Sequence, residues 1–241
     1  MAGNAEPPNQ RQLPHKDGLR SDPRLCKLAP MNRLHYFYDP QCGWCYAVAP
    51  LIKAAAELPG VQLTLHGGGL WPKPTLLPRE TRERIRVLDQ KVAELTGQPL
   101  GQSYLEDLLP SDGMLLHSAP TTAAVLAAGL LQPGADLRML RALQTAHYVE
   151  GAHTTEQSVH LRLAVALGLD AKAFMAQLDL AKAKAHIEQS QALMQRFGVQ
   201  GFPTTLVESR KGFTLVPAQE WFGKPDGFVA AIQAALGERL H

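Results

Sequence analysis

Apolar and polar residues near the start of the chain follow two different periods. Residues 34–38 read Leu-His-Tyr-Phe-Tyr and predict a buried strand, because aromatic residues follow one another with little polar interruption. In residues 43–58 the apolar positions recur at helical spacing, and Pro59-Gly60 ends the run. Residues 61–65 alternate as a second strand. Because a helix joins the two strands, we expect them to be parallel.

The middle of the chain predicts helices only. Residues 78–197 contain no convincing strand and are rich in Ala, Leu, Arg and Gln. We expect helices at residues 79–96, 117–131, 135–150, 155–167, 171–178 and 181–197. Turn residues such as Pro133-Gly134 and Gly168 separate some of these segments.

Strand character returns in the last part of the chain. Residues 204–207 and 213–216 are two short strands joined by the turn residues 209–212, so they are expected to form an antiparallel hairpin. Pro225 begins a final helix. The order strand–helix–strand, helical block, strand–strand–helix predicts an α/β fold, a mixed sheet with helices on its faces and a large all-helical insertion.

The same pattern divides the chain into domains. Residues 1–30 are polar and proline-rich, which predicts a flexible tail. Residues 31–77 and 198–241 are expected to form one α/β domain together. Residues 78–197 are expected to form a helical domain inserted into it.

Composition and charge narrow the possible partners. The chain has 241 residues with 24 basic and 22 acidic side chains, and its net charge of +2 gives no reason to invoke nucleic acid or an anionic membrane. No apolar run follows the basic residues near the start, and every apolar stretch is too short to cross a membrane. We therefore expect a soluble, cytoplasmic protein, whose oligomeric state the sequence leaves open.

The cysteines supply the candidate chemistry. Three are too few for a disulfide scaffold, and two of them form the motif Cys42-Gly43-Trp44-Cys45 while Cys26 stands alone. The motif follows a strand and begins a helix, where unpaired N–H groups and the helix dipole favour a thiolate. We assign Cys42, at the helix tip, as the attacking thiolate and Cys45, one turn deeper, as the thiol that resolves the mixed disulfide.

The residues between the cysteines have supporting roles in this interpretation. Gly43 and Trp44 are expected to tune exposure and nucleophilicity, and Trp44 also offers an apolar surface to a peptide. The alternative use of a C-x-x-C motif is as half of a zinc site. Only His35, His66 and Cys26 are available as further ligands, without a second paired motif, so no metal is expected.

Two segments far apart in the chain resemble one known family. The sequence Asp39-Pro40-Gln41 before the cysteine motif, with Pro50 in the helix after it, resembles the active-site helix of thioredoxin-fold proteins. Residues 198–205, Gly-Val-Gln-Gly-Phe-Pro-Thr-Thr, resemble that family's loop with a cis-proline, which faces the dithiol. The resemblance implies a thioredoxin-like sheet, with Phe202 and Pro203 binding an extended substrate through the backbone.

The helical block makes the chain similar to DsbA-like proteins, and most similar to predicted protein-disulfide isomerases with a Cys-Gly-Trp-Cys centre. This resemblance implies a thiol–disulfide oxidoreductase or isomerase that acts on protein or small disulfides. No cofactor is then needed beyond the dithiol, with glutathione or another thiol as possible co-substrate. Two departures stand out. Tyr36 occupies the place of the buried acid found in many thioredoxin-like enzymes, and the histidine of strongly oxidising DsbA centres is missing.

Two other functions stay open. Kappa-class glutathione transferases and 2-hydroxychromene-2-carboxylate isomerases share the DsbA-like layout, but usually have serine at the first cysteine position, so the complete motif argues against them. A non-catalytic thiol holdase or metal carrier is the third possibility.

Several other polar or aromatic residues receive plainer interpretations. Asp39 is expected to have a turn or capping role, and His66 to be an ordinary hydrogen-bonded residue at a strand end. Gly67–Gly69 predicts a flexible wall of the substrate groove, and Trp71 is expected either to cap that groove or to lie in the core. The remaining candidates, His147, His153 and His160, are interpreted as surface or satisfied polar residues.

Overall fold

The structure is a computed structural model that describes residues 32–237. The predicted tail at residues 1–30, with Cys26, lies outside the described residues. The division into an α/β domain and an inserted helical domain stays a prediction.

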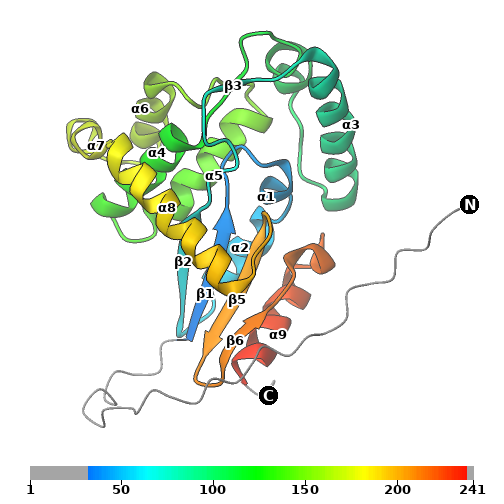
Figure 1. Ribbon diagram of the computed structural model, residues 1–241, viewed down its shortest axis with the longest axis vertical. Coiled ribbons are helices and arrows are strands. Elements are labelled where there is room, and N and C mark those ends of the chain that lie inside the picture. Colours follow the sequence, from blue (N-terminus) through cyan, green and yellow to red (C-terminus); the bar gives the residue numbers. More distant parts are fainter. Residues whose placement is uncertain (1–31, 238–241) are drawn as a thin grey trace, which may run out of the picture.

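A four-stranded mixed sheet forms the centre of the lower half in Figure 1, in the order β2-β1-β5-β6. Strand β1 (Asn32–Tyr38) pairs in parallel with β2 (Val61–Gly67) and antiparallel with β5 (Thr204–Ser209). Strand β6 (Gly212–Leu215) pairs antiparallel with β5 at the sheet edge. The predicted strand directions and hairpin are confirmed. Strand β1 lies in the middle of the sheet, and its residues 34–38 are buried on both faces.

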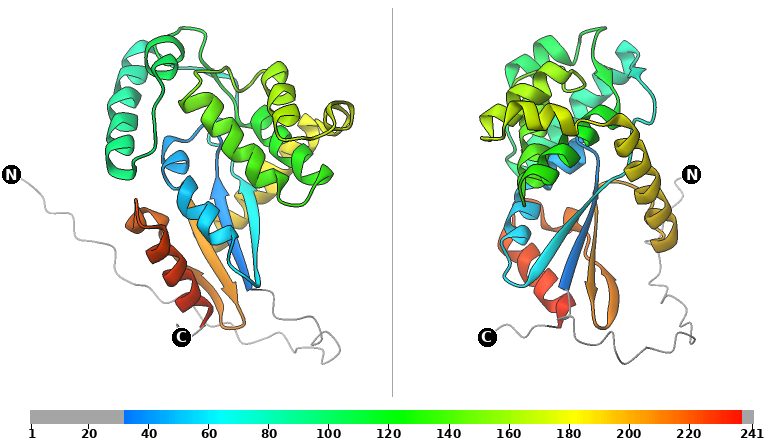
Figure 2. Two further views of the ribbon diagram at one scale, coloured as in Figure 1. Left: turned by 180° about the vertical axis from the view of Figure 1, so that it is seen from behind. Right: turned by 90° about the vertical axis from the view of Figure 1, so that its left-hand side faces the viewer.

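Helices cover both faces of this sheet (Figure 2). Helix α2 (Ala49–Ala56) packs with α9 (Pro225–Leu236) on one face, and α8 (Leu180–Phe197) lies across the other. The predicted helix at 43–58 is two helices, because α1 (Gly43–Ala47) ends before Pro50. Proline has no N–H for the carbonyl of Tyr46, and that oxygen accepts a hydrogen bond from Gln98 Nε2 at 2.8 Å instead.

The predicted helices of the middle segment are confirmed, with ends that differ by no more than two residues. They are α3 (Arg79–Thr96), α4 (Ser118–Leu131), α5 (Ala135–Tyr148), α6 (Gln157–Ala166), α7 (Ala171–Gln177) and α8. A π-helix, η2 (Ser103–Leu108), and a 3₁₀-helix, η3 (Ala218–Trp221), were not predicted.

The expectation that residues 78–197 hold no strand is wrong. Strand β4 (Leu115–Leu116) pairs antiparallel with β3 (Thr75–Leu76). Two residues are too few to show an alternating pattern, so the sequence carries no signal for this pair.

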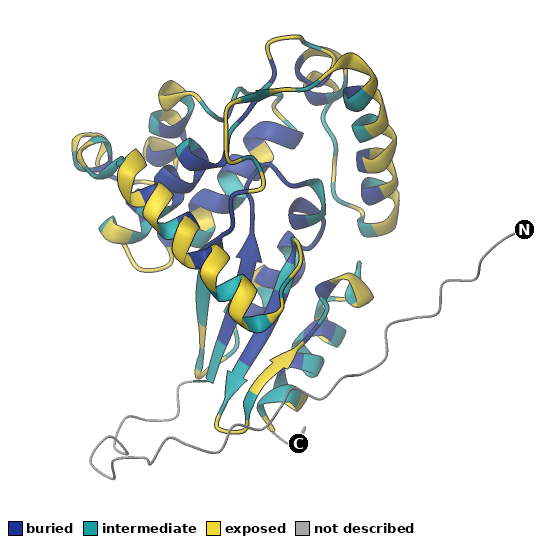
Figure 3. Cartoon of the chain, in the orientation of Figure 1, coloured by how far each residue is buried: buried dark blue, intermediate teal, exposed yellow. Residues whose placement is uncertain are grey.

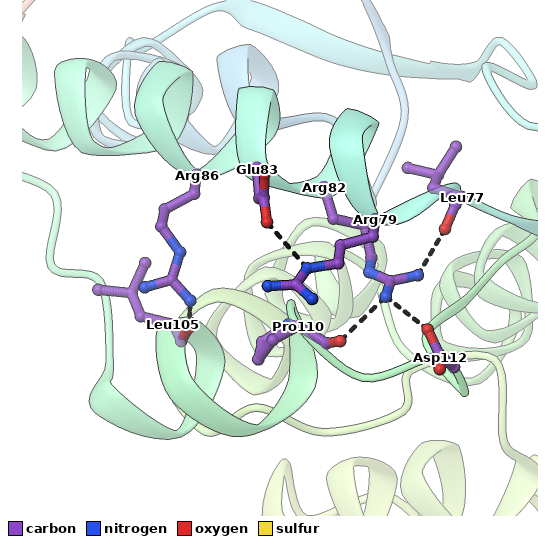
Figure 4. A network of polar contacts seen from close by, with 8 residues as sticks. All are labelled: Leu77, Arg79, Arg82, Glu83, Arg86, Leu105, Pro110 and Asp112. Atoms are coloured by element: carbon purple, nitrogen blue, oxygen red, sulfur yellow. Dashed lines mark hydrogen bonds and ion pairs between the residues drawn. The ribbon is translucent and has the colours of Figure 1, made fainter.

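Arginine side chains of α3 donate hydrogen bonds to η2 and to the segment that follows it (Figure 4). The Arg82 guanidinium is buried and donates to the carbonyl oxygens of Leu77 at 2.5 Å and Pro110 at 3.0 Å, and to Asp112 at 2.6 Å. Further along the helix, Arg86 donates to the carbonyl oxygen of Leu105. These bonds fix the position of the helix that carries Asp89.

Buried residues form two clusters, and the dark-blue regions of Figure 3 concentrate on β1 and the elements around it. The larger cluster contains residues of the sheet and of α2, α4, α5 and α9, together with Cys42 and Cys45. The smaller cluster joins α1 to the helical segment through stacked rings, with Tyr46 and Tyr148 4.7 Å apart. Within residues 32–237, no helix is long and apolar enough to cross a membrane.

Candidate active site

The cysteine motif lies at the junction of β1 and α1. Cys42 is the N-cap residue of α1 in an extended conformation, and its N–H donates to the carbonyl of Asp39 at 3.2 Å. Both cysteines are free thiols. Cys42 is 5% exposed and Cys45 is 0% exposed, so the first cysteine is the more accessible one, as predicted, although both are buried.

The two thiols differ in their surroundings. Burial raises the pKa of the Cys45 thiol well above its usual range, and the neighbouring Cys42 raises it further. Cys45 therefore stays protonated at neutral pH. The Tyr36 hydroxyl donates to the carbonyl of Cys45 at 3.3 Å.

Asp39 organises the turn before Cys42, which confirms the turn role predicted for it. Its Oδ1 accepts from the N–H of Gln41 at 2.9 Å. Its Oδ2 accepts from the N–H of Leu70 at 2.9 Å and from the Ser118 hydroxyl at 2.5 Å. Burial raises the pKa of this carboxyl, and the hydrogen bonds oppose that shift. One side chain thus fixes the cysteine turn to the glycine loop and to α4.

The second predicted motif begins β5. The bond between Phe202 and Pro203 is cis, as the resemblance implied, and Thr204 pairs with Phe37. This register places Pro203 at the end of the sheet from which β1 leads to Cys42. Pro203 is buried, and its carbonyl accepts from Gln219 Nε2 at 2.8 Å.

The glycine loop packs against this segment. Gly68 and Gly69 are buried, and a Cβ atom added to Gly68 would collide with the Phe202 ring. Close packing thus explains glycine at position 68, where the sequence pattern predicted a flexible wall. Phe202 itself packs against the larger core cluster, as does Trp44, whose ring stacks on Phe222 with centroids 5.9 Å apart.

A pocket of about 160 Å³ lies beside the dithiol. The cysteine motif forms one wall, and side chains from the predicted helical insertion form the other. The lining residues include Cys42, Gly43, Trp44, Trp71, Ile85, Asp89, Tyr104, Met114, His147 and Tyr148. Trp71 lines the groove and also packs against the smaller core cluster, so both positions considered for it are found. Its Nε1–H donates to the carbonyl of Gln41 at 3.4 Å.

The fold agrees with that of known proteins. A family model described as DSBA-like thioredoxin domain matches residues 33–229. The chain belongs to the DSBA-like thioredoxin domain family. Membership confirms the thioredoxin-like fold class and the resemblance found in the sequence.

Two structures of one relative are similar to this DSBA-like protein. The cytosolic disulfide reductase DsbM from Pseudomonas aeruginosa is 40% identical with a TM-score of 0.77, over 85% of this chain and 98% of that chain. The same protein solved with GSH gives 40% identity and a TM-score of 0.76, over 85% of this chain and 99% of that one.

Two more distant relatives extend the comparison. A putative protein disulfide isomerase from Nitrosomonas europaea is 26% identical with a TM-score of 0.70, over 86% of this chain and 96% of that one. The curated ClpXP adapter protein SpxH from Halalkalibacterium halodurans is 26% identical over 178 residues, 70% of this chain. The chain spans only 56% of the length of that curated relative.

The interpretation of His147 in this DSBA-like chain is wrong. Its side chain is buried in the pocket wall, packed on the rings of Tyr104 and Tyr148. Its Nδ1 has no hydrogen-bond partner among the described residues. The sequence around it does not indicate which way its side chain points, and only the packing of α5 reveals this. His160, by contrast, is satisfied as predicted, by the carbonyl of Thr154 at 2.7 Å.

The buried imidazole predicts acid sensitivity. Burial lowers the pKa of His147 from 6.5 to about 4. Folding therefore favours the neutral ring, a stabilisation that is complete above the unfolded pKa and is lost as pH falls toward 4. In urea unfolding at pH ~7.5 and ~4.5, we expect wild type to lose about 2–3 kcal/mol more than His147→Phe. Equal losses in the two proteins would contradict a buried neutral His147.

The role predicted for His66 is confirmed. Its Nε2 lies 2.9 Å from Nδ1 of His35, whose Nε2 is 3.1 Å from Glu208. His66 does not line the dithiol pocket. In the described part of the chain, no group of three or more His, Cys, Asp or Glu side chains is placed to hold a metal ion.

Proposed function

We propose that this protein is a thiol–disulfide oxidoreductase in which Cys42 attacks substrate disulfides and Cys45 resolves the product. The main support for this proposal is that the two free thiols at the start of α1 differ in how far they are exposed. Cys42 is the more accessible thiol, whereas burial keeps Cys45 protonated until it is needed. The supporting groups are Gly43 and Trp44 between the cysteines.

The proposed reaction consists of two successive thiol–disulfide exchanges, and the dithiol supplies both electrons. The Cys42 thiolate forms a bond to one substrate sulfur, and the second substrate sulfur leaves as a thiolate that takes up a proton. Cys45 then loses its proton and attacks Cys42, which forms the Cys42–Cys45 disulfide and releases the other substrate thiol. The substrate gains two electrons. Two molecules of a thiol such as glutathione restore the dithiol and become a disulfide.

The proposed substrate-binding residues are Trp44, Phe202 and Pro203. Trp44 lines the pocket beside Cys42, and Phe202 packs against the same core cluster as the cysteines. Strand pairing supports a place for Pro203 at the cysteine end of β1. An extended peptide that lies along residues 202–203 would bring its disulfide toward Cys42.

Glutathione is the proposed small thiol, and a cytoplasmic location is part of the proposal. Both are supported by the similar Pseudomonas aeruginosa protein, which is named a cytosolic disulfide reductase and was solved with GSH. A reducing compartment would keep the pair as dithiol and would favour reduction or isomerisation of substrates over net oxidation.

Trapping of the first intermediate tests this proposal. Cys45→Ser lacks the resolving thiol, so incubation with glutathione disulfide should leave one glutathionyl group on Cys42. Intact-mass and peptide mass spectrometry measure the adduct, and Cys42→Ser is the matched control that should lack it. An unmodified Cys42 in Cys45→Ser would contradict the assignment. Continued turnover of glutathione with an electrophile by Cys45→Ser would favour the transferase alternative.

A further inference from the structure

Asp89 is a buried carboxyl group in the pocket wall opposite the cysteine motif. It comes from α3 and is only 7% exposed. One oxygen, Oδ2, accepts a hydrogen bond from the Tyr104 hydroxyl at 2.5 Å. No ion pair of Asp89 is found within residues 32–237, so its charge has no cationic partner there.

The other oxygen of this carboxyl group lies against the dipeptide between the cysteines. A Cβ atom built on Gly43 would collide with Asp89 Oδ1 and would lie 3.9 Å from the Tyr148 hydroxyl. The carboxyl group therefore occupies the space that any side chain at position 43 would need. Glycine at this position permits the close approach.

The same pocket brings the carboxyl group near Cys42. Cys42, Gly43, Asp89 and Tyr148 all line it. Besides burial, the negative charges of Asp89 and of Cys42 both raise the pKa of the Tyr148 hydroxyl, so this one hydroxyl lies close to both groups. Two anions in one poorly hydrated pocket repel each other.

An ionised carboxyl group is unfavourable in this place, although it accepts the hydrogen bond of the buried Tyr104 hydroxyl. Burial raises the pKa of Asp89 to about 6, so the group is mostly ionised at neutral pH although ionisation in this place is unfavourable. Ile85, four residues before Asp89 in α3, lines the same pocket with an apolar side chain. A charge kept in such a position can act on the groups that face it.

We propose that Asp89 is a positioning residue for the redox equilibrium: its carboxylate, held against Gly43 in the pocket that Cys42 lines, repels negative charge on the Cys42 sulfur and makes the dithiol a stronger reductant. A dithiol whose thiolate is stabilised becomes oxidising, because the reduced form is then favoured. A nearby negative charge acts in the opposite direction. This inference rests on the proposed function and adds which direction of electron transfer the site favours.

The test replaces the charge and keeps the shape. Asp89→Asn retains an oxygen that can accept from the Tyr104 hydroxyl. We expect its equilibrium with glutathione to shift roughly threefold to tenfold toward the dithiol, which is about 15–30 mV for a two-electron couple. In the Cys45→Ser background, the ultraviolet absorbance of the Cys42 thiolate should appear at lower pH when Asn replaces Asp89. A merely structural role would move neither quantity.

Two further variants keep the test decisive. Glu83→Gln removes an exposed carboxylate on the same helix, where Glu83 pairs with Arg79, and should leave both quantities unchanged. Tyr104→Phe removes the hydroxyl that stabilises the Asp89 charge, and should shift the equilibrium in the same direction as Asp89→Asn by a smaller factor. An Asp89→Asn protein with the wild-type equilibrium constant, or with a shift toward the disulfide, would overturn the inference. Disulfide reduction by the wild-type protein is measured alongside. If the wild type does not reduce disulfides, the proposed function fails; if it does, an unchanged Asp89→Asn overturns only the inference about Asp89.

Discussion

Cys42→Ser should abolish disulfide reduction by this protein. With insulin as substrate and dithiothreitol as reductant, the catalysed rate should fall by roughly two orders of magnitude or more, to that of dithiothreitol alone. A serine hydroxyl stays protonated at neutral pH, so no anionic nucleophile remains at the start of α1. Cys45 cannot replace it, because it is fully buried and burial keeps it protonated. The onset of insulin turbidity measures the rate.

Controls separate loss of the nucleophile from loss of any cysteine. Cys26→Ser removes the third cysteine and should keep the wild-type rate. Cys45→Ser should turn over slowly, while it accumulates a mixed disulfide with the substrate. Reduction at the wild-type rate by Cys42→Ser would remove Cys42 from the mechanism and would leave the family membership intact.

Local rules predicted most of the fold. Each predicted helix between residues 79 and 197 exists, because amphipathic periods and glycine or proline turns mark their ends. At Gly97 and Gly198, for example, the left-handed backbone that ends α3 and α8 suits only glycine well. The π-helix η2 and the β3–β4 pair escaped prediction because neither has a period that repeats within its own length.

The cysteine side of the candidate site could also be predicted from the sequence, because its signal is local. Two cysteines with fixed spacing at a strand–helix junction form a local pattern. The opposite wall is not local. Asp89 lies in a helix with several exposed charges, where Val87 and Leu95 are 66% and 49% exposed while Asp89 is buried. Hydrophobic patterning along α3 therefore does not indicate that the side with Asp89 faces the interior.

His147, in the same wall, illustrates the same limit. Its position in α5 was predicted, but the direction of its side chain depends on packing against Tyr104, which lies in the unpredicted η2. One residue that shapes the pocket, Tyr104, thus comes from an element without a sequence signal. Gly43 was the one available hint, because glycine between two cysteines permits the close approach of a group from elsewhere.

A second glycine carries the largest expected effect on stability. Gly101 precedes η2, and its N–H donates to the carbonyl of Tyr148 at 2.9 Å. A Cβ atom at this position would overlap the carbonyl oxygen of Val149 and lie 2.6 Å from its carbonyl carbon. These are backbone atoms, so no rotation of a side chain can relieve the overlap. Either η2 or the end of α5 must move, and with it the pocket wall that contains Tyr148.

Gly101→Ala should therefore lower the free energy of unfolding by about 3 kcal/mol, and the midpoint of thermal unfolding by ~6–12 °C. Gly113→Ala is the matched control, because its Cβ would lie 3.4 Å from the Ser111 hydroxyl oxygen at the nearest. The control should stay within about 0.5 kcal/mol of wild type in urea unfolding. If Gly101→Ala were as stable as Gly113→Ala, the close contact between residue 101 and the backbone of Val149 would be wrong. The pocket wall formed by His147 and Tyr148 would then need a different position relative to Cys42.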